Sequence, residues 1–436
     1  MNASFEIAYA AAAGHLCLFT GTGFSKAVTS NAAPSWQALL ESTCEGLPNE
    51  EGLKAALFDP SAKNRLALDE AAQVIAIERQ KAGLPDIHDA VGEMIAGLAP
   101  SGDNSMISAF LSENRIQVIT TNYDKLLEGL VVHGDVNSIC PGLPVPRATA
   151  AVNVYHVHGS TDSPANMIVT SNDYMAFMRG ESFFSRKLST ILYENTVVIL
   201  GYSLGDANLR AILGDYRGFA REQLIGGNIV LVSKDVVDQH LKDYYASCYG
   251  MRVIDDIDID TLFAFISASI PAAKASVESS MYATRKLLEE NEFYADSYLK
   301  SRVSFFEIVA SLGAIGRSIC SPDVVSALGA VIAKKTEFTG VKDAWVQYDH
   351  LAEWLIYLGS ILEIAGTSME PVYLHAVRQS MSTMSKVLYY GFSWQAYKTW
   401  DATWFDILAP NRLLIRDYIA ANLVYKEDAL EIVNRG

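Results

Sequence analysis

The chain has 436 residues, half of them hydrophobic, and a formal net charge of −16 at neutral pH. This length exceeds one compact domain of usual size, so we expect two or three domains with an ample core. The acidic balance and the lack of a Lys/Arg block argue against direct nucleic-acid binding, although they leave room for a local basic patch.

The cysteines and the apolar segments favour a soluble cytoplasmic protein. The five cysteines lie far apart and no C-x-x-C pair occurs, so we expect neither a structural zinc site nor a disulfide framework. The alanine-rich N-terminus contains Glu6 and lacks a basic leading region, unlike a signal peptide. The longest apolar candidate for a membrane span, Trp354–Ile364, is short and contains Glu363.

Short apolar runs alternate with helical segments over the first 255 residues. Six runs predict strands: Leu16–Thr20, Ile116–Thr120, Val152–Val157, Val197–Leu200, Ile229–Val232 and Met251–Ile254. Five segments predict helices: Trp36–Cys44 with Ser35 as N-cap, Ala67–Ala82, Lys125–Leu130, Ser182–Asn195, and Asn208–Gly214 with Asp206 as cap. This alternation predicts an α/β fold, with a Rossmann-like, mostly parallel sheet that has helices on both faces.

Helical periodicity replaces this alternation after Ile270-Pro271. The predicted helices are Tyr282–Glu292, Tyr298–Ile319, Val324–Lys335, Ala344–Ala365, Val372–Tyr390 and Arg412–Val424. We therefore predict a boundary near residue 275, with an α/β domain over 1–275 and an all-helical domain over 276–436. Leu351–Ala365 is apolar nearly all round, which indicates burial either in a helical bundle or at an oligomer interface.

Small or polar clusters follow several of the predicted strands, where an open α/β sheet binds its ligands. After the first strand comes Gly21-Thr22-Gly23-Phe24-Ser25. Its glycines would allow the backbone to approach a pyrophosphate at a helix N-terminus, but a simple tight turn explains them equally well. The full G-x-G-x-x-G is absent because Lys26 takes the last position. Glu41 has the spacing of a ribose-binding acid, but it falls on the amphipathic helix and is interpreted as surface.

The second strand runs into Thr120-Thr121-Asn122-Tyr123-Asp124, which places an amide and a carboxylate at the sheet edge. Both side chains have an alternative use as caps of the following helix. That alternative suits Asp124 better than Asn122.

Two histidines, His156 and His158, lie on the same face of the third predicted strand. No third ligand lies nearby, so we expect no metal. His158 is suited to act as a general base or to orient a hydroxyl, and Gly159 would leave room for a ligand. We expect His156 to face neighbouring helices or to support the site.

The fourth and fifth predicted strands end in further small residues. Gly201 and Gly205 allow close approach, and Ser203 is placed to bond a ribose or phosphate oxygen. For Asp206 a cap and a site role weigh evenly. Ser233 is the weakest candidate, because serine often ends a strand.

Together these clusters resemble the sirtuin-like family over about residues 5–270. Gly21–Ser25 resembles the family's G-A-G-x-S loop, with Thr22 in place of alanine. Thr121–Asp124 resembles its T-Q-N-x-D strand end, and His158-Gly159 its catalytic H-G pair. Gly201-Tyr-Ser203 is similar to the G-x-S stretch that lines the NAD ribose.

Two departures narrow the resemblance. Protein-deacylating sirtuins carry two C-x-x-C pairs that hold zinc, and none stands between His158 and Gly201. The G-I-P-D-F-R stretch is also absent, and 34–40 occupies that region. Both features are similar to the prokaryotic sirtuin-like branch of anti-phage defence, whose members hydrolyse NAD. The resemblance therefore implies an NAD glycohydrolase, with NAD as substrate, no metal and an oxocarbenium-like transition state.

The resemblance also implies roles for individual residues. Asn122 would position the attacking water or the ribose hydroxyls, and His158 would be the general base or a hydroxyl partner. Backbone N–H groups around Thr22–Phe24 would hold the pyrophosphate. Asp124 would orient Asn122, polarise the site or cap its helix. The remaining cofactor-binding candidates are Gly21, Ser25, Thr121, Gly201, Ser203 and Ser233.

The helical remainder resembles the family member that assembles with a HerA-type ring ATPase. The resemblance implies a regulated homo-oligomer that depletes NAD⁺ during phage attack by abortive infection. Two other functions stay open: an NAD-dependent protein deacylase without the zinc module, and a non-catalytic NAD or ADP-ribose sensor. The absent C-x-x-C pairs argue against the first, and the presence of Asn122 and His158 argues against the second.

Overall fold

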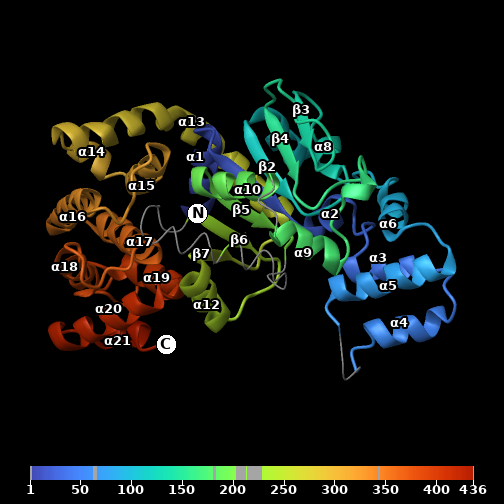
Figure 1. Cartoon of the computed structure of the whole chain (residues 1–436). Helices are drawn as coiled ribbons and strands as arrows, with labels where there is room; N and C mark the ends of the chain where they lie inside the picture. The colour runs from blue at the N-terminus through green and yellow to red at the C-terminus, as the bar shows by residue number, and fades with distance from the viewer. Residues whose placement is uncertain are drawn as a thin grey trace.

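The computed structural model describes residues 2–61, 66–179, 183–202, 213, 228–341 and 344–435. Within these residues, seven parallel strands form one sheet in the order β3-β4-β2-β1-β5-β6-β7 (Figure 1). The strands are β1 (Leu16–Thr20), β2 (Ile116–Thr120), β3 (Val136–Ile139), β4 (Val152–His156), β5 (Thr196–Leu200), β6 (Ile229–Val232) and β7 (Met251–Ile254). All six predicted strands are confirmed. The sequence analysis missed β3, an edge strand whose short run Val-Asn-Ser-Ile is half polar.

Alternate residues of the strands enter two different cores, as the period of a strand requires. Leu16 and Leu18 face α1 (Asn2–Ala12), α7 (Ser105–Glu113), α8 (Leu126–Leu130) and α13 (Ile259–Glu290). Cys17 and Phe19 face α10 (Phe183–Glu194) and α12 (Gln239–Tyr249) on the other side. Helices therefore cover both faces of a parallel sheet, which confirms the predicted fold class.

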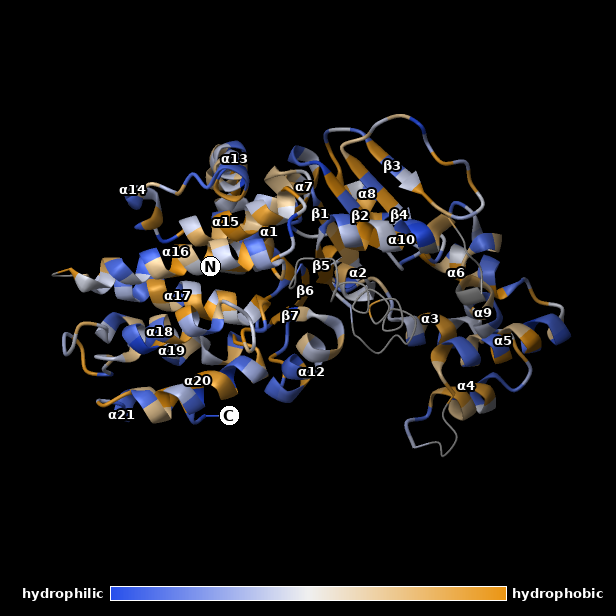
Figure 2. Ribbon diagram, turned by 60° about the vertical axis from the view of Figure 1, so that its left-hand side comes forward, coloured by the Kyte–Doolittle hydropathy of each residue, from blue (hydrophilic) through white to orange (hydrophobic). Residues whose placement is uncertain are grey.

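Four helices inserted between β1 and β2 form a small module, which we call the cap. They are α3 (Trp36–Thr43), α4 (Glu50–Phe58), α5 (Leu68–Ala82) and α6 (Ile87–Ile95). Ser35 caps α3 as predicted, because its Oγ accepts a hydrogen bond from the Ala38 N–H at 3.2 Å. The cap has its own hydrophobic core, which also takes in Tyr123 and Met167 from the segments after β2 and β4. It lies at the opposite end of the molecule from the C-terminal helices (Figures 1 and 2).

The C-terminal part consists, in its described residues, of helices joined by loops. After α13 come α14 (Asp296–Leu299), α15 (Ser304–Ala314), α16 (Pro322–Glu337), α17 (Trp345–Ile361), α18 (Glu370–Met381), α19 (Trp394–Thr403), α20 (Ala409–Asn422) and α21 (Glu427–Val433). The predicted start at Tyr282 is wrong, because α13 begins at Ile259 and contains Pro271. The predicted helix Tyr298–Ile319 is split into α14 and α15.

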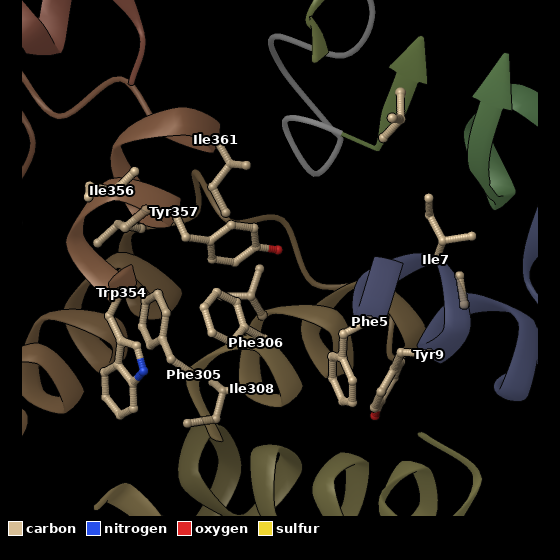
Figure 3. Packing of buried hydrophobic residues seen from close by; sticks show 14 of the residues in the cluster. Phe5, Ile7, Tyr9, Phe305, Phe306, Ile308, Trp354, Ile356, Tyr357 and Ile361 are labelled. Atoms are coloured by element: carbon tan, nitrogen blue, oxygen red, sulfur yellow. The ribbon is translucent and has the colours of Figure 1, made fainter. Parts of the chain in front are cut away.

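One continuous core joins the C-terminal helices to the sheet. In Figure 3, side chains of α1, α15 and α17 meet in this core. The Tyr9 hydroxyl lies 2.7 Å from Ser280 Oγ and 2.8 Å from Ser311 Oγ. Residues 351–361 are buried within the chain itself, so a bundle core explains their apolar character without a subunit interface. The division at residue 275 stays a prediction, and α13 crosses it as a single helix.

None of the helices in the described ranges combines the length and the apolar character needed to cross a membrane.

Candidate active site

The register of the sheet brings four strand ends to one edge. Thr20 of β1 pairs with Thr120 of β2 and with Leu200 of β5, and Thr120 pairs with His156 of β4. The clusters that follow these strands therefore leave the sheet at the same level. The chain runs from β1 to β2 on one side and later reaches β5 on the other, so the sheet changes winding direction beside β1. Such a switch point is where open α/β folds bind ligands.

A buried serine links the two polar residues after β2. Ser25, only 3 % exposed on α2 (Thr22–Val28), accepts a hydrogen bond from Asn122 Nδ2 at 2.8 Å. The Ser25 hydroxyl donates in turn to Asp124 Oδ2 at 2.7 Å. Because an amide nitrogen only donates, the amide oxygen Oδ1 of Asn122 is the atom that can accept a hydrogen bond from a water or a sugar hydroxyl.

The Asp124 carboxylate contacts both Ser25 and the start of α8, and its role in the reaction stays a prediction. Its Oδ2 accepts from Ser25, and its Oδ1 accepts from the Leu126 N–H at 3.2 Å at the start of α8. Burial raises the pKa of Asp124 above its usual value, and the hydrogen bonds from Ser25 and Leu126 oppose that rise. Asn122 does not cap α8, because its side chain binds Ser25 instead.

His156 supports the backbone of Asn122. Its fully buried ring places Nδ1 3.2 Å from the Asn122 carbonyl oxygen and Nε2 2.9 Å from Glu128 Oε1. Burial pushes the pKa of Glu128 upward, but the hydrogen bonds and charges of His156 and Lys125 outweigh burial and hold it at about 2. Sequence reasoning missed Glu128, since a glutamate inside a short helix carries no distinguishing pattern.

His158 lies in an aromatic enclosure made by α9 (Ser171–Arg179). The rings of Tyr174 and Phe177 meet its ring edge to face, at centroid distances of 5.3 and 5.9 Å. His158 is 6 % exposed, and its carbonyl accepts from the Ile168 N–H at 2.8 Å. Gly159 has φ +90°, and a Cβ there would lie 2.7 Å from Met167 Cα. The space beside Gly159 is therefore filled by the chain and not left for a ligand, contrary to the sequence interpretation.

The glycines after β1 and β5 allow these two loops to touch. A Cβ on Gly201, which has φ +61°, would lie 2.0 Å from the Phe24 nitrogen, and one on Gly23 would lie 2.7 Å from Gly201 Cα. The Gly23 N–H donates to the Gly201 carbonyl at 2.7 Å, and the Phe24 N–H donates to the Gly21 carbonyl at 2.9 Å. Both N–H groups are thus engaged within the chain. Their predicted contact with a pyrophosphate would require these hydrogen bonds to be exchanged.

The other candidates lie as follows. Thr121 is half-buried beside Thr20, and Thr22 begins α2. Ser233 follows β6, and its hydroxyl donates to the Asp235 carbonyl at 2.7 Å. Glu41 lies on α3, bonded to Gln37 of the same helix. Ser203, Gly205 and Asp206, with the helix predicted over 208–214 apart from residue 213, lie outside the described residues.

No cluster of three or more His, Cys, Asp or Glu side chains that could hold a metal ion occurs in the described ranges.

Comparison with known proteins agrees with this architecture. Residues 116–254 match the family model of the SIR2-like domain, a segment that contains Asn122, Asp124 and His158. The chain is similar to "Defense-associated sirtuin 2" of Bacillus subtilis, with 24 % identity over 255 residues that cover 57 % of this chain and 24 % of that protein.

Two further relatives carry the name "NAD(+) hydrolase ThsA". The protein of Enterococcus faecium is 32 % identical over 151 residues, 31 % of each chain. That of Cytobacillus dafuensis is 24 % identical over 204 residues, which cover 44 % of this chain and 40 % of that one. The chain thus spans between a quarter and two fifths of the length of these relatives.

Proposed function

We propose that this protein is an NAD⁺ glycohydrolase, which cleaves the bond between nicotinamide and ribose. The observation that carries the proposal is the hydrogen-bonded series Asn122–Ser25–Asp124 at the ligand-binding edge of a parallel sheet. The SIR2-like match and the relatives named NAD⁺ hydrolases support it.

In this reaction the C–N bond to nicotinamide breaks and one water adds to the ribose carbon, which releases nicotinamide, ADP-ribose and a proton. Positive charge develops on the ribose before the water attacks. Asn122 Oδ1 would accept a hydrogen bond from the water or a ribose hydroxyl and so fix its position. His158 would take the proton that the water loses. The other residues of the edge would bind the cofactor, with those on β1 and β5 nearest the switch point.

Nicotinamide release from NAD⁺ by the purified protein tests this proposal, with products separated by chromatography. We expect release by the wild type, and a large loss in Asn122→Ala and in His158→Ala. Asn422→Ala is the matched control, because Asn422 is exposed on α20 and its Nδ2 binds only the Tyr418 carbonyl in its own helix. If wild type binds NAD⁺ but leaves it intact even with its partner, the protein is a sensor. If an acyl-peptide is needed and an O-acyl sugar forms, it is a deacylase.

We further propose that the protein acts in anti-phage defence as a homo-oligomer regulated by a HerA-type ATPase. The loop between α18 and α19 exposes Tyr389, Tyr390 and Phe392 by 60–80 %, and Tyr425 between α20 and α21 is 84 % exposed. Lys386 of the first loop forms an ion pair at 2.8 Å with Glu431 of α21, the helix that follows the second loop.

Four aromatic rings of about 150–250 Å² each, mostly uncovered, supply a large part of the ~800 Å² per partner of a standard interface. We propose a second copy of the chain as the occupant of this surface. Light scattering on wild type and on Tyr389→Ser/Tyr390→Ser, with and without the ATPase, tests the assembly. A monomer under all conditions would refute it. NAD⁺ levels in infected cells test the defence role.

A further inference from the structure

A histidine of the cap bridges two carboxylates next to the candidate site. His88 occupies the second position of α6, and its Nδ1 lies 2.5 Å from Asp86 Oδ1, the residue that caps this helix. Its Nε2 lies 2.9 Å from Oδ2 of Asp173, which belongs to α9. Because both partners are carboxylates, both ring nitrogens donate and the ring carries a positive charge. His88 thus links the cap to α9 through charge-assisted hydrogen bonds.

Asp173 organises the beginning of α9. Its Oδ2 accepts from the Val169 N–H at 3.1 Å and from the Thr170 N–H and hydroxyl at 2.8 Å each. Burial works to raise the pKa of Asp173, but the hydrogen bonds from His88 and Thr170 outweigh burial and hold it at about 2. The same carboxylate therefore fixes both the entry to α9 and the distance of α9 from the cap.

α9 carries the two rings that enclose His158. Tyr174 follows Asp173 directly, and Phe177 lies one turn further on the same helix. Their rings contact the His158 ring at 5.3 and 5.9 Å. A shift of α9 away from the cap would therefore move both rings that hold His158.

The charged groups near His88 come from its own helix and from the elements that pack on α6. On α3, one of these elements, the carboxylate of Glu41 accepts a hydrogen bond from Gln37 of the same helix. Asp86 stands at the start of its own helix and Asp173 on α9. From α5, which packs on α6, the guanidinium of Arg79 binds the Pro85 and Thr43 carbonyls. The segment 164–166 also packs on α6 and contains no titratable residue. The hydrogen bond between His88 and Asp173 has the largest effect on the pKa of His88. It outweighs the opposing effect of burial, and the pKa is raised to about 9.

We propose that His88 is a positioning residue for the reaction at His158, which acts by holding α9 and its two aromatic rings against that histidine. This inference rests on the proposed NAD⁺ cleavage for its kinetic consequence, but the contacts themselves do not depend on it. Loss of a proton from His88 would remove the positive charge and one of the two N–H donors that link the cap to α9. Turnover should therefore fall as pH rises through about 9.

The kinetic test is His88→Gln, which keeps a polar side chain but no charge. We expect kcat for nicotinamide release to fall between about 10-fold and 100-fold, with a smaller change in KM, since a small misplacement of a reacting group has effects of that size. We also expect the variant to lack the loss of activity near pH 9. Asp173→Asn, which keeps an oxygen for the N–H groups of 169 and 170, should behave alike.

The chain offers a matched control in His240. It too takes the second position of a helix whose cap, Asp238, accepts from its N–H at 2.8 Å, but it is exposed on α12, away from α9. His240→Gln should leave kcat and the pH profile as in wild type. If His88→Gln has wild-type kcat and still loses activity near pH 9, the positioning role is wrong.

Histidine NMR separates this inference from the proposed activity. In ¹³C-labelled wild type, the Cε1–H signal of His88, assigned by its absence in His88→Gln, should titrate near pH 9. The His158 signal should shift over the same range in wild type and not in the variant. If the protein shows both shifts but does not turn over NAD⁺, the proposed function is wrong and the coupling between His88 and His158 stands. If the chemical shift of the His158 signal does not change over this pH range and is the same in His88→Gln, the coupling is wrong, whether or not the protein turns over NAD⁺.

Discussion

Replacement of Ser25 by alanine tests the candidate site at its centre. The hydroxyl accepts from Asn122 Nδ2 at 2.8 Å and donates to Asp124 Oδ2 at 2.7 Å, in a position only 3 % exposed. The variant leaves an amide hydrogen and a largely desolvated carboxylate oxygen without this partner. A neutral hydrogen bond contributes about 1 kcal/mol and one to a charged group about 1.5–3 kcal/mol, so we expect a loss of about 2–4 kcal/mol in the free energy of unfolding.

The same substitution should lower turnover. Without Ser25, the amide of Asn122 is free to rotate, and its Oδ1 no longer has a fixed direction. We expect nicotinamide release to fall about 100-fold, the effect of misplacing a positioning group by about 1 Å.

Urea unfolding and nicotinamide release of Ser25→Ala should be measured beside Ser42→Ala. The hydroxyl of Ser42 donates only to the Ala38 carbonyl in its own helix, at 3.1 Å, so its loss should change stability by no more than about 0.5 kcal/mol. If Ser25→Ala matched wild type in both assays, the hydrogen-bonded series would not organise the site.

Three further predictions concern other parts of the structure. Gly201→Ala should destabilise the fold by more than about 2 kcal/mol in urea, because its Cβ would lie 2.0 Å from the Phe24 nitrogen. Gly250→Ala is the control, because Gly250 has φ +65° and a Cβ there would meet nothing within 4 Å, so only the left-handed backbone penalty of about 1–2 kcal/mol is expected. If both variants lost the same stability, the close contact between the loops after β1 and β5 would be contradicted. For His88, the folded-state pKa is raised from 6.5 to about 9, so its contribution is complete below pH 6.5 and lost as pH rises through 9. His88→Gln should therefore be less stable than wild type by up to about 3 kcal/mol at pH 6 and equal to it above pH 10, and a pH-independent difference would contradict this. Burial lowers the pKa of the fully buried Lys335 to about 7, so its contribution becomes more favourable as pH rises from 7 toward 10.5. Relative to Lys335→Met, wild type should gain about 3–5 kcal/mol over that range, and a constant difference would show that Lys335 stays charged.

The sheet and the meeting of its polar strand ends at the candidate site could be predicted from the sequence because both depend on local pattern. Apolar runs such as Ile116–Thr120 end in turn residues, and parallel strands bring such ends together without any knowledge of side-chain contacts. The weakly patterned edge strand β3 was missed for the same reason. The start of α13 was missed because Pro271, usually a helix boundary, lies inside a helix of 32 residues.

The side-chain network of the site could not be read in this way. Ser25 and Asn122 are 97 residues apart, and His88 and Asp173 are 85 apart. Such pairs depend on how the cap and α9 pack on the sheet, and neither position carries a local signal of its partner. The sequence therefore indicated Ser25 as a cofactor contact, whereas the structure places its hydroxyl between two polar side chains of the chain itself.

Nicotinamide release from NAD⁺, measured for wild type and Asn122→Ala with and without the proposed HerA-type ATPase, tests the central claim most directly. We predict that wild type releases nicotinamide and ADP-ribose in equal amounts and that Asn122→Ala, folded as judged by its melting temperature, does not. Equal release by both proteins, or none by wild type although it binds NAD⁺, would contradict the account.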